Sequence, residues 1–307
     1  MSFMANKQKL FRRMIRYRNL YLLFLPVLLY FFIFSYIPMY GIQIAFKDYL
    51  YKLGIWGSPW VGLRHFQSLV NNKEFLKVLY NTVFISLMRL IIGFPAPIIF
   101  ALLLNELYHV VFKKIVQTIS YLPYFISWVV LGGIFKEMLS PSRGVINYFL
   151  TLLGIEPIYF LVSDFWFITT LLLTGVWQGF GWGAVIYIAA ISGIDQEQYE
   201  AAVIDGANRF HRMKYITLPA IMPVISIVLI LSMSGILNAG FDQIFNLYNP
   251  TVYTVSDILD TYVYRRGIQN AEFSFTTAVG FFKNVVGFAL VLITNSVVKK
   301  LNGEGIW

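Results

Sequence analysis

The sequence predicts an all-α integral membrane protein with six membrane-spanning helices and a short water-exposed helix between the fourth and the fifth. Hydrophobic residues make up 58% of the 307 residues and charged residues only 13%, with a mean hydropathy of +0.67. This balance is typical of membrane proteins and excludes an ordinary water-soluble domain. Six apolar stretches each exceed the roughly 20 residues that a helix needs to cross the hydrocarbon core. One polar stretch, residues 195–215, lies between two of them and still has helical spacing.

The predicted elements follow one another with short connections. Residues 1–19 form a basic segment with six Lys and Arg, which suits an interfacial helix on anionic lipid, although solvated disorder also fits this composition. A membrane domain, residues 20–300, holds the spans, and residues 301–307 form a tail. The spans are expected at about 20–46, 78–104, 115–135, 165–194, 216–240 and 275–298. Pro95 and Pro97 predict a kink in the second span, because proline lacks the N–H of a helical hydrogen bond.

The distribution of charge predicts which side of the membrane each connection faces. The N-terminal segment, the connections 105–114 and 195–215 and the C-terminus carry 13 Lys and Arg against 6 Asp and Glu. The opposite connections carry 9 basic and 9 acidic residues. Because cytoplasmic loops carry the excess of Lys and Arg, the first side is expected to be cytoplasmic, with both termini on it. The net charge of +9 then reflects membrane orientation, and nucleic acid is not expected as a partner.

The sequence lacks the catalytic motifs of several classes of enzyme. There is no GxxxxGK[ST] phosphate loop, no GxSxG and no HExxH, so ATP hydrolysis by this chain is not expected. The chain has no cysteine, and its three histidines, His65, His109 and His211, lie far apart. No catalytic residue, metal site or bound cofactor is therefore expected.

The polar stretch 195–215 is predicted to form a compact knob in water. Asp195 can cap a helix, with Gln198 three residues later in the spacing of a capping box. Gly206 interrupts the helical pattern, and Pro219 marks the entry to the next span, where a missing N–H matters least. A short helix, a glycine break and a second helix make a plausible docking surface for a partner, although an ordinary amphipathic loop helix has the same pattern.

This stretch resembles the EAA loop of the permease subunits of bacterial ABC importers. The matching residues are Glu200-Ala201-Ala202, Asp205-Gly206-Ala207, Ile216 and Leu218-Pro219. The resemblance implies the type I importer permease fold, with a coupling helix that seats in a cleft of a cytoplasmic ATPase. It assigns the coupling role to Glu200, Ala201, Ala202, Asp205, Gly206, Ala207, Leu218 and Pro219.

Other segments resemble the carbohydrate branch of these permeases, in particular the LplB-like polysaccharide and oligosaccharide group. They are residues 38–49, 57–62, 261–265 and 303–307. The resemblance implies a bacterial inner-membrane complex of this permease, a second related permease, two ATPase subunits and an extracytoplasmic solute-binding lipoprotein. ATP and Mg would be held by the ATPases. ATP binding would rock the two permeases from inward-open to outward-open, and a saccharide would pass through the cavity between them.

Charges within the spans are candidates for the substrate path, because charge inside a bilayer is costly and faces the protein interior or a water-filled route. Lys283 lies on the same helical face as Gly280 and Gly287. It can contact a polar ligand or form a structural ion pair, with Asp242 or with another subunit. Arg89 is expected to snorkel or to lie at a helix interface.

Further path candidates combine aromatic rings with amide or carboxylate groups, as saccharide sites do. Gln178 and Trp182 share a helical face at i and i+4, and Asn238 and Asp242 are expected to do so at the end of the fifth span. The full set of path candidates is Trp177, Gln178, Trp182, Asn238, Asp242, Lys283 and Asn284. Helix packing through the glycines of the fourth span is the alternative role for this region.

Three rival functions fit parts of the pattern. A passive channel has spans and buried charges, but it has no need of the docking knob. A membrane-embedded enzyme needs a catalytic cluster at one depth, which the sequence lacks. A permease for peptides or amino acids would share the EAA loop, and the richness in aromatic residues, 18%, favours a saccharide over these cargoes.

Overall fold

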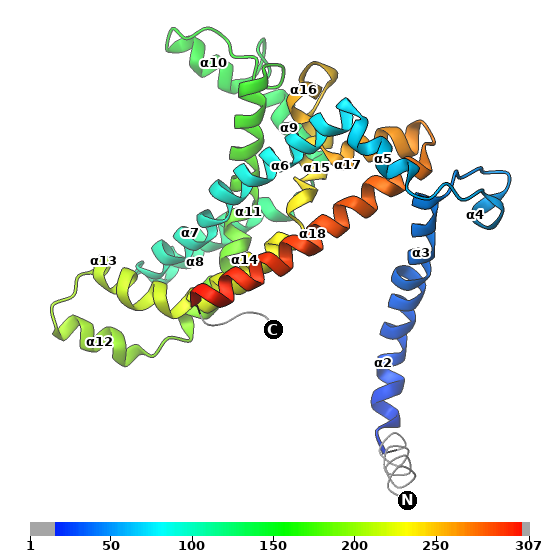
Figure 1. The fold of residues 1–307 in the computed structure, drawn as a ribbon. Coiled ribbons are helices and arrows are strands. Elements are labelled where there is room, and N and C mark those ends of the chain that lie inside the picture. Colours follow the sequence, from blue (N-terminus) through cyan, green and yellow to red (C-terminus); the bar gives the residue numbers. More distant parts are fainter. Residues whose placement is uncertain (1–15, 303–307) are drawn as a thin grey trace, which may run out of the picture.

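The computed structural model describes residues 16–302, so residues 1–15 of the basic segment and residues 303–307 of the tail lie outside the described part (Figure 1). Within that part the structure is helical, with one isolated antiparallel bridge between Lys47 and Trp60. Five helical stretches are long and apolar enough to cross a membrane, and two shorter helices make a sixth if they count as one span. The predicted all-α class is confirmed.

The first span, Arg18–Phe46, consists of α2 (Arg18–Phe31), a π-helical turn (Phe32–Tyr36), α3 (Ile37–Met39) and a 3-10 helix (Tyr40–Phe46). It leaves the other helices at its N-terminal part, α2 and α3, whereas its last residues, Tyr40–Phe46, pack against α18 (Phe273–Asn302) and α5 (Arg64–Asn71) (Figure 1). No residue of α2 is buried. The side chains of α2 are apolar, so this helix has no packing partner within the described chain and leaves its surface for lipid or another subunit.

The second span runs from Lys73 to Asn105 in two helices. α4 (Gly54–Gly57) and α5 (Arg64–Asn71) precede it, and Asn72 caps α6 (Lys73–Gly93) by accepting a hydrogen bond from the Phe75 N–H at 3.1 Å. α7 (Pro95–Asn105) begins at Pro95. The break between α6 and α7 therefore falls at the predicted proline kink.

The region expected as the third span is bent. α8 (Val110–Tyr121) continues through a tight turn to Phe125, and α9 (Trp128–Met138) leaves it at 100°. Pro123 lies in this turn, and the hydroxyl of Ser127 caps α9. The expected third span, 115–135, is therefore not one continuous helix, because the chain contains both a helix-stopping proline and a new helix start within that range.

The fourth span, α11 (Asp164–Ser192), packs along α7 and follows the projecting helix α10 (Val145–Leu152) (Figure 1). Gly183 allows close contact, since a Cβ there would lie 3.0 Å from the Pro97 side chain. A Cβ at Gly181 would collide with the Ser120 carbonyl, whereas one at Gly179 would meet nothing within 4 Å. Helix packing is thus the role of Gly181 and Gly183.

The fifth span, Arg209–Ser234, ends earlier than the expected residue 240. α13 (Arg209–Arg212) runs through a wide turn into α14 (Leu218–Ser234), and Gly235 ends the helix. The backbone then takes positive φ at Ala239 (47°) and Gly240 (81°), which redirects the chain into α15 (Phe241–Leu247). α16 (Tyr253–Ser256), α17 (Leu259–Val263) and the long α18 (Phe273–Asn302) complete the fold.

Three apolar clusters hold these helices together. One packs α5, α6, α17 and α18 around Tyr262, and a second packs α6, α11 and α15 around Phe167. The third packs α7, α11 and α14 around Tyr187 and Ile221, next to the polar stretch. The candidate sites therefore lie on helices that are fixed by packed cores.

Candidate functional site

The polar stretch 195–215 folds as a helix, a glycine turn and a second helix, as predicted. α12 (Gln196–Ile204) is capped by Asp195, whose carboxylate accepts from the Glu197 N–H at 3.0 Å and not from Gln198, as a capping box would require. Gly206 has φ 80°, and the Ala207 N–H bonds back to the Ala202 carbonyl at 2.9 Å. We call residues 195–215 the coupling loop.

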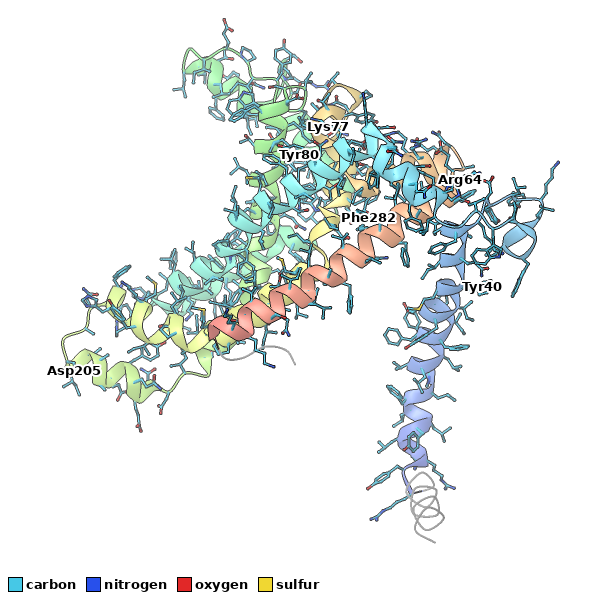
Figure 2. The ribbon with its side chains drawn as sticks, viewed as in Figure 1. Tyr40, Arg64, Lys77, Tyr80, Asp205 and Phe282 are labelled. Atoms are coloured by element: carbon cyan, nitrogen blue, oxygen red, sulfur yellow. The ribbon has the colours of Figure 1, made fainter. Side chains whose placement is uncertain are left out.

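The coupling loop presents apolar and acidic groups to solvent. Glu200, Ala201, Asp205 and Gly206 are exposed, and Ala202 and Ala207 are half-buried. The apolar side chains of Ile204 and Phe210 are also exposed, at 87% and 61%. Asp205 lies at the far tip of the loop in Figure 2. Exposed apolar residues beside a few charges are typical of a surface that another protein covers.

The base of the coupling loop is tied to the chain segment after α7. Arg212 pairs with Glu106 at 3.8 Å, while the Tyr199 hydroxyl lies 2.9 Å from that of Thr217, just after the loop. The Arg209 guanidinium lies 4.5 Å from the centre of the Tyr108 ring. A polar cavity of about 260 Å³ lies within this junction. Sequence reasoning missed these partners, because the segment around 106–108 is about 100 residues away and belongs to no recognised motif.

Leu218 and Pro219 lie where the loop enters the membrane span. Leu218 is half-buried and packs against the cluster of α7, α11 and α14. Pro219 is exposed and lies just after the wide turn Met213–Thr217, within the helical run Arg209–Ser234, from which it removes one N–H donor. These two residues therefore connect the exposed loop to the packed spans.

Two cavities lie within the bundle. The first has a volume of about 400 Å³ and the second about 660 Å³. Both are lined by Arg89, Asn238 and Gly240, so they meet at these residues. The first extends along α7, α11 and α14. The second extends toward α17 and is lined by Trp128, Phe241, Asp242, Gln243, Asp260, Val263, Tyr264 and Ile268.

Asn238 and Asp242 were expected on one face of a continuous helix, and this expectation was wrong. The positive φ angles at Ala239 and Gly240 separate a tight turn that contains Asn238 from α15, which contains Asp242. Both residues nevertheless line the second cavity. Helical spacing therefore does not explain why these two residues line the same cavity.

Arg89 lies at a helix interface and does not snorkel. Its Nη2 donates to the Gln243 side-chain oxygen, and Gln243 in turn donates to the Leu171 carbonyl and the Thr174 hydroxyl, each at 2.8 Å. Gly240 makes this possible, since a Cβ there would collide with the guanidinium. The network joins α6, α15 and α11.

Lys283 forms an ion pair, but its partner differs from the expected Asp242. The Lys283 Nζ lies 2.5 Å from Asp260 Oδ1, and the two side chains are 17% and 26% exposed. The pair ties α18 to α17 beside the second cavity, which Asp260 lines. Asn284, the next residue, is exposed.

The aromatic candidates of α11 pack against the bent third region. Trp182 stacks on Tyr124 with ring centres 5.2 Å apart, and Gln178 donates to the Tyr124 carbonyl at 3.3 Å. Trp177 meets Phe135 edge to face at 5.8 Å. None of the three lines either of the two cavities described above.

A charged network at the end opposite the coupling loop holds the 253–274 segment. Arg265 bonds Asp257 at 2.6 Å and Glu74 at 3.4 Å, and Arg266 bonds Glu272 at 2.8 Å. The hydrogen bond to Asp257 raises the pKa of Arg265 above its usual value, with help from the nearby negative charges and against the effect of burial. In the described residues no group of three or more His, Cys, Asp or Glu could hold a metal ion.

Comparison with known proteins places this geometry in a family. Residues 93–302 match the family described as binding-protein-dependent transport system inner membrane component. The protein LplB of Bacillus subtilis is 45% identical over 94% of this chain and 91% of its own length. The polygalacturonan/rhamnogalacturonan transport system permease protein YteP of the same organism is 44% identical over 98% and 94%.

A solved structure has the same fold over nearly its whole length. It is a chain of a bacterial ABC transporter involved in the import of the acidic polysaccharide alginate. The similarity has a TM-score of 0.89 with 39% sequence identity, and it covers 96% of this chain and 99% of that one. The six-span count, with the bent pair as one span, agrees with this fold. The chain therefore belongs to the family of inner membrane components of binding-protein-dependent transport systems, and it is a transport subunit, not an enzyme.

Proposed function

We propose that this chain forms half of the translocation path of an ATP-driven, binding-protein-dependent importer of an oligosaccharide or polysaccharide. The observation that carries the proposal is the near-full-length similarity to a permease named for polygalacturonan and rhamnogalacturonan and to a chain of an alginate importer. A peptide or amino-acid permease would share the coupling loop, but these relatives, which match 94% or more of the chain, favour a saccharide.

The proposed orientation places the coupling loop and both termini in the cytoplasm. The end of α18, the start of α2 and the loop of α12 and α13 lie toward the same end of the molecule (Figure 1). The connections at this end carry the excess of Lys and Arg. The positive-inside rule then assigns this end to the cytoplasm and α10, α16 and α4 to the other side.

The proposed role of the coupling loop is to dock on a cytoplasmic ATPase. Glu200, Ala201 and Asp205 would meet the ATPase surface, and Gly206 with Ala202 and Ala207 would set the shape of the loop. Leu218 and Pro219 would pass its movement to α14. ATP and Mg would be bound by the ATPase subunits, and this chain itself would need no cofactor.

The proposed complex also contains a second related permease, two ATPases, a solute-binding lipoprotein and membrane lipid. A solved alginate transporter was crystallised in complex with an alginate pentasaccharide-bound periplasmic protein, and one of its chains matches this chain with a TM-score of 0.90 and 38% identity. The unpaired helix α2 gives the second permease an apolar surface to cover. Asn238 and Asp242 are the proposed cargo contacts among the original candidates, because they line a cavity.

Co-purification and uptake together test this function. The tagged chain is extracted in mild detergent, its partners are identified, and the complex is reconstituted in proteoliposomes with ATP inside. We expect an ATPase, a second permease and a solute-binding lipoprotein, and ATP-dependent uptake of an oligosaccharide. If the chain is recovered alone and supports ATP-independent flux, it is a passive channel. If the complex imports peptides and no saccharide, the cargo assignment is wrong.

A further inference from the structure

Arg89 is a half-buried cation with no counter-charge in the described chain. It lies on α6, well inside the 33-residue span Lys73–Asn105. Among the described residues no carboxylate oxygen lies within the 4.0 Å of an ion pair with it, whereas Lys283, a cation in the middle of α18, has Asp260 at 2.5 Å. An unpaired charge in a membrane interior is costly, and such charges mark the routes of polar or charged ligands.

The guanidinium retains hydrogen-bonding capacity. Arginine has five N–H donors in a planar fork, and within the described residues the Arg89 side chain bonds only the Gln243 oxygen. The Nε–H is buried and has no partner in the described residues. Because Gln243 is itself fixed by two hydrogen bonds to α11, the guanidinium is held in place with donors to spare.

The backbone around Arg89 is shaped to admit it. Gly240 has φ 81°, and a Cβ at this position would collide with the Arg89 guanidinium. A Cβ at Gly175 would lie 3.2 Å from the Gln243 oxygen that Arg89 bonds. Two glycines on different helical elements thus keep the cation at the point where the two cavities meet.

The second cavity has the composition of a saccharide site. Trp128 and Tyr264 supply aromatic rings that can cover the C–H face of a sugar, and Asn238 and Asp242 supply groups for its hydroxyls. The carboxylate of Asp242 would repel an acidic group on the cargo. An acidic sugar unit in this cavity is therefore best oriented with its carboxylate toward Arg89.

We propose that Arg89 binds the carboxylate of an acidic sugar unit as the cargo passes from the second cavity to the first, and so selects uronate-containing saccharides. This inference rests on the importer function proposed above. A carboxylate accepts two parallel N–H bonds from a guanidinium, a geometry that lysine does not reproduce. The bound cargo supplies the counter-charge that the chain lacks.

Site-specific labelling tests this proposal, because the chain contains no cysteine. The Asn238→Cys substitution is made in the otherwise complete importer, and the rate of its modification by a thiol reagent is measured on this subunit. Trigalacturonate and its fully methyl-esterified, uncharged form are the added probes. The labelling measurements with both saccharides are then repeated in the Arg89→Gln and Arg89→Lys variants. Ser142→Cys, exposed near α10 and far from the cavity, is the matched control.

We expect trigalacturonate to slow the labelling at position 238 and not at position 142. Arg89→Gln should raise the half-protecting concentration at least tenfold, and Arg89→Lys should raise it less. The half-protecting concentration of the uncharged ester should change by less than twofold. Equal losses for both saccharides, or no loss for either, would overturn the proposal.

Two other outcomes are also decisive. If both Arg89 variants fail to assemble with the other subunits, Arg89 is a structural residue that a partner's carboxylate neutralises, and the proposal is wrong. If the unmodified importer takes up neither saccharide into proteoliposomes, the proposed function itself fails. Uptake of both saccharides with protection that does not depend on charge would refute only the role of Arg89.

Discussion

Arg212 and Glu106 join the coupling loop to the turn that follows the second span. Their Nη2 and Oε2 atoms lie 3.8 Å apart, and the side chains are only 18% and 21% exposed. The pair connects two segments about 100 residues apart in the sequence. It gives the loop a second attachment besides its continuous entry into α14, so a movement of the loop would reach α7 and α14 together.

Breaking this pair should weaken coupling. We expect Arg212→Ala or Glu106→Ala to lower ATP-dependent uptake severalfold while the subunit still inserts and assembles, because an ion pair partly shielded from water is lost and one charge is left unpaired. The ratio of uptake to ATP hydrolysis in proteoliposomes measures this effect. The exchanged pair, Glu106→Arg with Arg212→Glu, should recover part of the ratio. No recovery in the exchange would show that the two charges do not act on each other.

Gly206 should be required because of its backbone conformation and not because a side chain there would collide with neighbouring atoms. Nothing lies within 4 Å of a Cβ built there, but its φ is 80°. Gly206→Ala should destabilise the turn by about 1 kcal/mol, and the branched side chain of Gly206→Val should do so more strongly. We expect uptake to fall in the order Gly, Asn, Ala, Val, because Asn tolerates the left-handed region better than Ala does. An Asn variant as impaired as Val would contradict this explanation.

Glu200→Lys tests the surface of the coupling loop separately from its shape. Glu200 is exposed on α12, and its side chain forms no hydrogen bond or ion pair with the described residues. Reversal of its charge should therefore leave the subunit stable and reduce its recovery with the ATPase in a pull-down. Glu197→Lys, one turn earlier on the same helix and also exposed, is the matched control. Similar losses for both variants would indicate a general effect of charge.

The sequence could predict the elements that local rules determine. The all-α class, the break at Pro95, the coupling-loop helices and the glycine turn at Gly206 follow from hydropathy, proline and glycine. The bend of the third region was missed, although Pro123 and Ser127 stood in the sequence. The reason is that an apolar window longer than 20 residues has the same hydropathy whether it is straight or broken.

The partners of polar side chains depend on tertiary structure, and sequence reasoning did not find them. Lys283 pairs with Asp260, and Asn238 and Asp242 line one cavity although Ala239 and Gly240 break the helix between them. For the aromatic residues of α11 both a path role and helix packing were open, and Trp182 stacks on Tyr124. Contacts between distant helices follow no fixed spacing, so the sequence could name candidate residues but not their partners.

Lys283 should be needed for stability because of Asp260. Lys283→Met would leave the Asp260 carboxylate partly buried and unpaired. Breaking a fully buried pair in this way lowers the free energy of unfolding by on the order of 3 kcal/mol, and the loss here should be smaller because both side chains are partly exposed. We expect a lower thermal midpoint in detergent and reduced membrane levels. The double variant Lys283→Met with Asp260→Asn removes both charges and should recover much of the loss. If the double variant is as unstable as the single one, Lys283 has a role beyond this pair, and a direct contact with cargo becomes the explanation to test.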